Sequence, residues 1–111
     1  MTEIVLPNTC TTISSSAFIN CTHLTTINFP TGLTEIERSA FEGCSSLSGI
    51  LDLSNTSVQN IKARAFYNTS YTGVIFPTTL TTYGEANNSS PLNTHLTIYK
   101  GLDNITTINA P

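Results

Sequence analysis

The chain has 111 residues, enough for one domain, and 39% of them are hydrophobic, which excludes a disordered protein. Charged residues make up only 10%, against roughly 25% in a typical domain, and the net charge is −3. We therefore expect no nucleic-acid binding, which needs a basic patch, and no membrane insertion, because no apolar run approaches the roughly 18 residues of a spanning helix.

A repeat organises the first part of the chain. At a shift of 23 residues the first two units share a proline, an isoleucine, an Ala-Phe pair and a cysteine in the same order. These are Pro7, Ile13, Ala17, Phe18 and Cys21 in the first unit and Pro30, Ile36, Ala40, Phe41 and Cys44 in the second. The third unit has Ile61 and Ala65–Phe66 25 residues further on, and its two extra residues fall within Ser48–Asn55.

The later units are degenerate. The fourth repeats the apolar positions of the second unit 47 residues later, at Tyr71, Val74, Phe76, Pro77, Leu80 and Tyr83, and a polar loop at 85–91 replaces the Ala-Phe pair. The fifth admits two alignments. Leu96, Ile98, Leu102 and Ile105 lie 22 residues after their counterparts, while the tail 105–111 also matches Leu24–Pro30. The units are approximately 1–23, 24–46, 47–70, 71–92 and 93–111, together one domain of residues 1–111.

Each unit has the pattern of one turn of a solenoid. The alternation ending in Ile27 and Phe29 predicts a short half-buried strand, and Pro30 stops its pairing. The segment Ser39–Cys44 is too short for a full helix and predicts one helical or 3₁₀ turn. Because no unit can bury its apolar side chains alone, stacking predicts a shared core and a parallel sheet with strands ~4.8 Å apart.

The repeat resembles the BspA-like, or Treponema pallidum type, leucine-rich repeat. The resemblance is carried by Leu24, Ile27, Phe29, Pro30, Leu33, Ile36, Ala40, Phe41 and Cys44. It implies a leucine-rich-repeat solenoid of four to five rungs, with a short parallel sheet on the concave face and irregular or 3₁₀ turns on the convex face. Family members are typically surface or secreted proteins of bacteria or protozoa associated with adhesion, although residues 1–7 do not have the pattern of a signal peptide.

In such a solenoid the strand residues between the inward ones face a partner. Here they are Glu3, Val5, Thr26, Asn28, Ile50, Asp52, Gly73, Ile75, Thr97 and Tyr99. Exposed apolar residues among polar ones often mark a contact surface, although singly scattered ones are ordinary surface. We therefore expect a non-catalytic module that binds a protein or glycan through this face. The alternative is a structural component of a larger particle that docks, or self-associates, through uncapped ends of the solenoid, unless the degenerate end units cap themselves.

The remaining cysteine, histidine and charged residues do not indicate a catalytic or metal-binding site. Three cysteines make a poor disulfide framework, and Cys21 and Cys44 are expected to stack as structural thiols. His23 and His95 fall about three rungs apart, roughly 14 Å at the strand spacing, too far to share a metal. Glu37 and Lys62 occupy equivalent positions and predict an ion pair between rungs. No catalytic or phosphate-binding motif is present, so we expect no enzyme, no metal and no cofactor.

Overall fold

The computed structural model describes residues 2–84, 97–100 and 107–108. Within these ranges the chain forms ten short strands and no helix, so none of the described segments offers a membrane-spanning helix. In chain order the strands are β1 (Glu3–Ile4), β2 (Thr12–Ile13), β3 (Thr26–Ile27), β4 (Glu35–Ile36), β5 (Ser48–Asp52), β6 (Asn60–Ile61), β7 (Ser70–Ile75), β8 (Thr82–Tyr83), β9 (Thr97–Lys100) and β10 (Thr107–Ile108).

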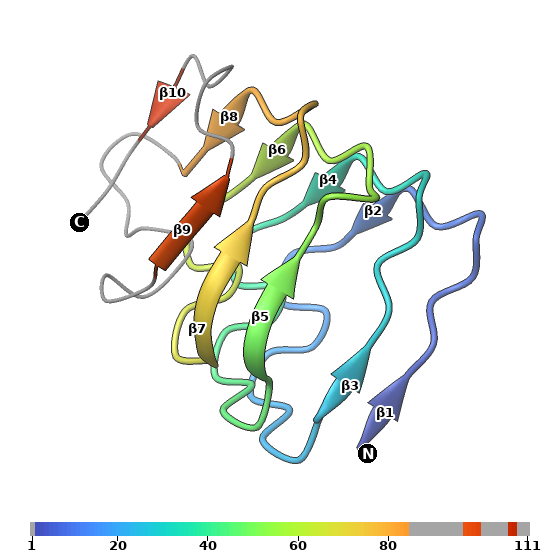
Figure 1. Ribbon diagram of the computed structural model, residues 1–111. Helices are drawn as coiled ribbons and strands as arrows, with labels where there is room; N and C mark the ends of the chain where they lie inside the picture. The colour runs from blue at the N-terminus through green and yellow to red at the C-terminus, as the bar shows by residue number, and fades with distance from the viewer. Residues whose placement is uncertain (1, 85–96, 101–106, 109–111) are drawn as a thin grey trace.

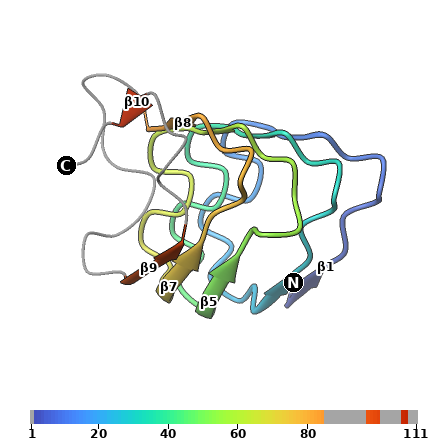
Figure 2. The ribbon, with the colours of Figure 1, turned by 45° about the horizontal axis from the view of Figure 1, so that its top comes forward.

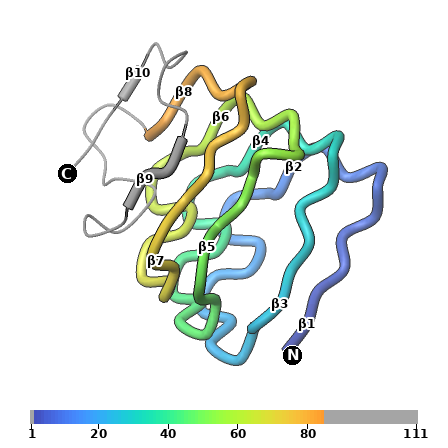
Figure 3. Tube along the Cα trace, viewed as in Figure 1, coloured from blue at the N-terminus to red at the C-terminus, as the bar shows by residue number. Residues whose placement is uncertain are grey.

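The strands alternate between two faces of a solenoid (Figure 1). On one face hydrogen bonds join β1 to β3 and, separately, β5 to β7 to β9, while the other face carries one sheet in the order β10-β8-β6-β4-β2. All the pairings are parallel, as the stacking of successive turns requires. Figures 2 and 3 show each turn passing along one face and returning along the other. The predicted parallel-sheet solenoid is confirmed, and the second sheet on the return side was not predicted.

Strand pairing fixes the register of the repeat. Ile13 pairs with Ile36, Ile36 with Ile61 and Ile61 with Tyr83, as the alignment of the first four units predicts. In the last unit Ile98 pairs with Val74 and Ile108 pairs with Tyr83. Both alignments considered for this unit are therefore wrong: the 22-residue shift places each strand too early, and the tail enters the second sheet instead of the first.

The Ala-Phe segment forms stacked tight turns instead of the expected helical or 3₁₀ turn. Left-handed residues recur on either side of it, at Ser16, Ser39 and Arg64 and at Asn20, Gly43 and Asn68. They interrupt a right-handed helical path. Successive N–H groups donate in alternation to a carbonyl within the same turn and to a carbonyl of the next rung. Among the bonds to the next rung, Phe18 N–H donates to Ala40 O at 2.8 Å, and Phe41 N–H donates to Ala65 O at 2.7 Å. This third side of the solenoid is thus hydrogen-bonded from rung to rung like a sheet.

A column of aromatic rings forms the centre of the core. The Phe41 ring stacks on Phe18 with centroids 5.3 Å apart and on Phe66 at 5.2 Å, with interplanar angles of 16° and 8°. Phe29 meets both Phe41 and Phe66 edge-on. Phe41 and Phe66 are fully buried, while Phe18, at the N-terminal end of the column, is half-buried. The repeated Ala-Phe pair therefore supplies one ring per rung, which aligns the first three rungs.

Hydroxyl groups join neighbouring rungs along the surface. Side chains of Thr and Ser donate to a carbonyl oxygen of the preceding rung, with oxygen–oxygen distances of 2.6–3.0 Å, in Thr25 to Thr2, Thr34 to Thr11, Ser46 to Thr22, Ser57 to Thr31 and Ser70 to Ser45. Each such bond contributes on the order of 1 kcal/mol. The high Thr and Ser content therefore has a structural role and is not only a polar coat.

Candidate binding face

The candidate binding face is the outward side of β1, β3, β5 and β7 with the residues that directly follow β1 and β3. Six residues predicted to face a partner are exposed on it: Glu3, Val5, Thr26, Asn28, Ile50 and Asp52. Ile75 is half-buried, and Gly73 is buried, because its lack of a side chain leaves nothing outside the sheet. Thr97 and Tyr99 belong to β9, whose side chains lie outside the described part of the chain.

Two polar residues of this face are engaged within the fold. The Asn28 Oδ1 accepts the Leu6 N–H at 2.6 Å, and the Asn28 Nδ2 donates to Leu6 O at 3.0 Å, so its amide extends the pairing of β3 with β1. The Asp52 Oδ1 accepts the N–H and the hydroxyl of Ser54, at 2.9 and 2.6 Å, which closes the turn after β5. The sequence did not reveal these roles, and they leave Val5 and Ile50 as the prominent groups of the face.

A slot divides the face between β3 and β5. These strands belong to separate sheets and share no hydrogen-bonded ladder. Ser46 Oγ donates to Thr22 O on one side of the slot and Ser57 Oγ donates to Thr31 O on the other, and the sequence separations are 24 and 26 residues. Both extra residues of the third unit therefore lie between these two bonds, in the segment that contains β5.

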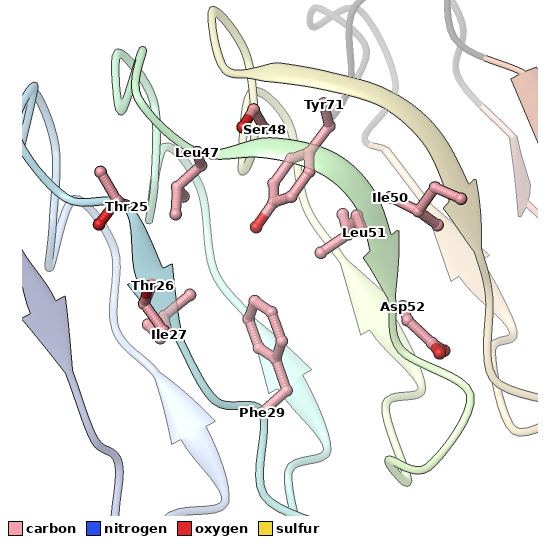
Figure 4. Close-up of a pocket in the computed structure, with 10 residues that line it drawn as sticks. All are labelled: Thr25, Thr26, Ile27, Phe29, Leu47, Ser48, Ile50, Leu51, Asp52 and Tyr71. Atoms are coloured by element: carbon pink, nitrogen blue, oxygen red, sulfur yellow. The ribbon is translucent and has the colours of Figure 1, made fainter.

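The slot is a cavity of about 270 Å³ with an apolar floor and a mainly polar rim (Figure 4). The floor is formed by Ile27, Phe29, Leu47, Leu51 and Tyr71, and the rim by Thr25, Thr26, Ser48, Ile50 and Asp52. Phe29 and Tyr71 each contact Phe66 edge-on, so the floor continues into the aromatic column. The sequence located the two extra residues but did not show that they open a cavity.

The Tyr71 hydroxyl points into the slot (Figure 4). Only 6% of this residue is exposed, and its hydroxyl has no hydrogen-bond partner within the part of the chain that the structure describes. Burial raises the pKa of Tyr71, and the nearby Cys44 raises it further. The hydroxyl is thus a neutral donor and acceptor at physiological pH, held by packing and directed into the cavity.

The other titratable side chains make contacts within the fold or lie on the surface. The Cys44 thiol donates to Phe18 O at 3.0 Å, and burial raises its pKa to about 11. The predicted ion pair is confirmed, with Lys62 Nζ 3.3 Å from Glu37 Oε2. His23 is exposed and His95 lies outside the described residues. Across the residues that the structure describes, no three His, Cys, Asp or Glu side chains gather as a metal site.

The two-faced parallel solenoid, with one Ala-Phe turn in each of the first three rungs, defines a leucine-rich-repeat protein. The profile of the BspA type leucine rich repeat region matches residues 1–110 in six copies, and the chain belongs to this family. It is also similar to the crystal structure of a leucine-rich repeat protein from Bacteroides ovatus, with a TM-score of 0.68 and 28% identity. That match covers 85% of this chain and 25% of the other, so the chain spans about a quarter of that protein. No curated protein matches the chain.

Proposed function

We propose that this chain is a non-catalytic binding module that recognises a protein or glycan partner through the candidate binding face, as an adhesin would. Leucine-rich repeats are often involved in protein interaction, and the family and fold are typically non-enzymatic. Because a fold alone does not fix a function, the proposal rests on the side chains that this face presents.

The observation that carries the proposal is the placement of exposed apolar side chains. Val5 is 74% exposed and Ile50 is 50% exposed, and both lie on the candidate binding face. Within the described residues Ile19 is the other large hydrophobic residue with comparable exposure, at 40%, and it lies on the turn side of the solenoid. Leaving apolar surface in water is unfavourable, and Val5 and Ile50 lie on the same face, on the first and third rungs, which favours a contact surface.

The test uses arrays of peptides and of oligosaccharides probed with the labelled full chain. Val5→Asp and Ile50→Asp are expected to weaken binding at least about tenfold, because each places a charge in the contact. Ile19→Asp makes the same chemical change away from the face and is the matched control. Circular dichroism would verify that all three variants are folded. Undiminished binding by folded Val5→Asp and Ile50→Asp would refute the proposed face.

A second candidate function is that of a structural subunit that docks on another copy through the N-terminal rung. The observation in its favour is that β1 and β2 end their sheets in the described structure and Phe18 stacks on one ring only. A rung of a second copy would continue both the pairing and the column. Sedimentation velocity at high concentration would show a dimer that Phe18→Ala weakens. A monomer at all concentrations would exclude this function.

A further inference from the structure

We propose that the slot between β3 and β5 binds an extended peptide segment, which inserts as an additional strand between the two halves of the divided sheet. The inference rests on the proposed function and makes it specific, since it names the class of partner and the place where it binds. Three features of the slot support it: the edges of two strands, a directed hydroxyl and an acidic residue on the rim.

The first feature is the pair of strand edges. Thr26 N–H donates to Thr2 O beside β1. Because successive backbone groups of a strand point to opposite edges, the N–H and C=O of Ile27 point toward the slot. On β5, Leu47 O accepts from Ser70 and Leu53 N–H donates to Ile75 O, both toward β7. The same alternation directs the backbone groups of Ser48 and Ile50 toward the slot.

Strand edges of this kind are templates for another strand. A peptide between β3 and β5 would pair with both, which is strand addition with two edges in place of one. β5 has five residues, ~16 Å at ~3.3 Å per residue, so a segment of about five residues matches its length. Every second side chain of that segment would point to the apolar floor, which favours a small apolar residue there.

The second feature is the Tyr71 hydroxyl. This hydroxyl opens into the slot, where a ligand group can replace solvent as its hydrogen-bond partner. Tyr71 is 6% exposed and its hydroxyl is directed into the cavity (Figure 4). A peptide carbonyl oxygen or N–H at the centre of the inserted segment would form a hydrogen bond with it.

The third feature is charge. Asp52 is the charged residue among those that line the slot, and its carboxylate keeps its negative charge while Oδ1 accepts from Ser54; the whole chain carries a net charge of −3. Electrostatic complementarity therefore favours a lysine or arginine in the peptide next to Asp52. A glycan would also suit a rim of hydroxyl groups, but a glycan leaves the strand edges unpaired, so we favour the peptide.

The experiment selects linear hexapeptides from a random phage-displayed library on the immobilised full chain. Affinities of the selected peptides are then measured by fluorescence polarisation. Peptides with one backbone amide methylated at a time separate pairing from side-chain contact, because methylation removes one N–H donor. Loss of at least about tenfold at each successive central amide is expected from pairing with both edges. No enrichment of any peptide, or loss only at alternate amides, which means addition to a single edge, would overturn the inference.

Matched variants test whether the peptide binds in the slot. Thr26→Trp fills the slot and is expected to lower affinity at least about tenfold. Thr12→Trp is the control, since Thr12 is likewise exposed and begins a two-residue strand, but on the opposite face. Tyr71→Phe keeps the ring and is expected to lower affinity about fivefold to tenfold without loss of thermal stability, because the hydroxyl bonds to the ligand and not to the protein.

The outcomes separate the inference from the proposed function. Val5 lies outside the slot, so binding that Val5→Asp weakens but Thr26→Trp leaves intact would keep the face and refute the slot. Binding of an oligosaccharide from the array that Thr26→Trp abolishes, with no peptide bound, would refute the peptide. If no variant of the face changes any binding, the proposed function fails together with the inference.

Discussion

Replacing Phe41 with alanine is the sharpest test of the aromatic column. The Phe41 ring is fully buried and lies between Phe18 at 5.3 Å and Phe66 at 5.2 Å, with Phe29 against its edge. Removal of a buried phenylalanine ring costs about 3–5 kcal/mol, because apolar burial is lost and a cavity remains. With two stacking partners lost as well, each worth roughly 0.5–1.5 kcal/mol, we expect a value at the upper end, about 5 kcal/mol.

Phe18→Ala is the matched comparison within the same column. Phe18 is half-buried and stacks on Phe41 alone, so we expect a cost of about 2 kcal/mol. A domain of this size has a free energy of unfolding on the order of 5–15 kcal/mol, so Phe41→Ala removes a large part of it. The midpoint of thermal unfolding should fall by roughly 20 °C for Phe41→Ala and by about half as much or less for Phe18→Ala.

The assay is urea unfolding followed by far-ultraviolet circular dichroism, with both variants and the unchanged chain measured under the same conditions. The free energy of unfolding is obtained by linear extrapolation. A Phe18→Ala cost equal to or greater than that of Phe41→Ala would refute the reasoning, because the end ring would then contribute as much as the ring enclosed on both sides.

Two further predictions concern glycine geometry and thiol ionisation. Gly43 and Gly49 both have positive φ, +80° and +83°, but a Cβ at Gly43 would overlap Asn20 Oδ1, while none of the described atoms lies within 4 Å of one at Gly49. Gly49→Ala should therefore cost about 1 kcal/mol and Gly43→Ala at least about 1 kcal/mol more, measured by urea unfolding; equal costs would contradict the overlap. Burial raises the pKa of Cys44 from 9.0 to about 11, so the unfolded chain loses this proton first. The free energy of unfolding should fall as pH rises from 9 to 11, and Cys44→Ala should reduce that fall. Iodoacetamide should also modify half-buried Cys10 before Cys44 in the folded chain; equal modification rates would contradict the burial of Cys44.

The candidate binding face shows where prediction from sequence stops. The alternation of residues along the strands predicted which side chains face outward, and Val5, Thr26 and Ile50 are exposed. The same pattern could not show that the Asn28 amide is bound to Leu6, because residue type does not specify a contact 22 positions away. The left-handed turns beside the Ala-Phe pairs were also missed, since apolar spacing records burial and not backbone handedness.

The sequence by itself determined the solenoid: recurring proline, isoleucine and phenylalanine positions force each turn to cover the apolar side chains of the next, whatever the details of the loops. It also located two additional residues within Ser48–Asn55. Only the tertiary structure decided that this added length opens a slot between β3 and β5. The hydrogen bonds at Ser46 and Ser57 join the turns at either end of the slot, and the extra residues lie between these two bonds.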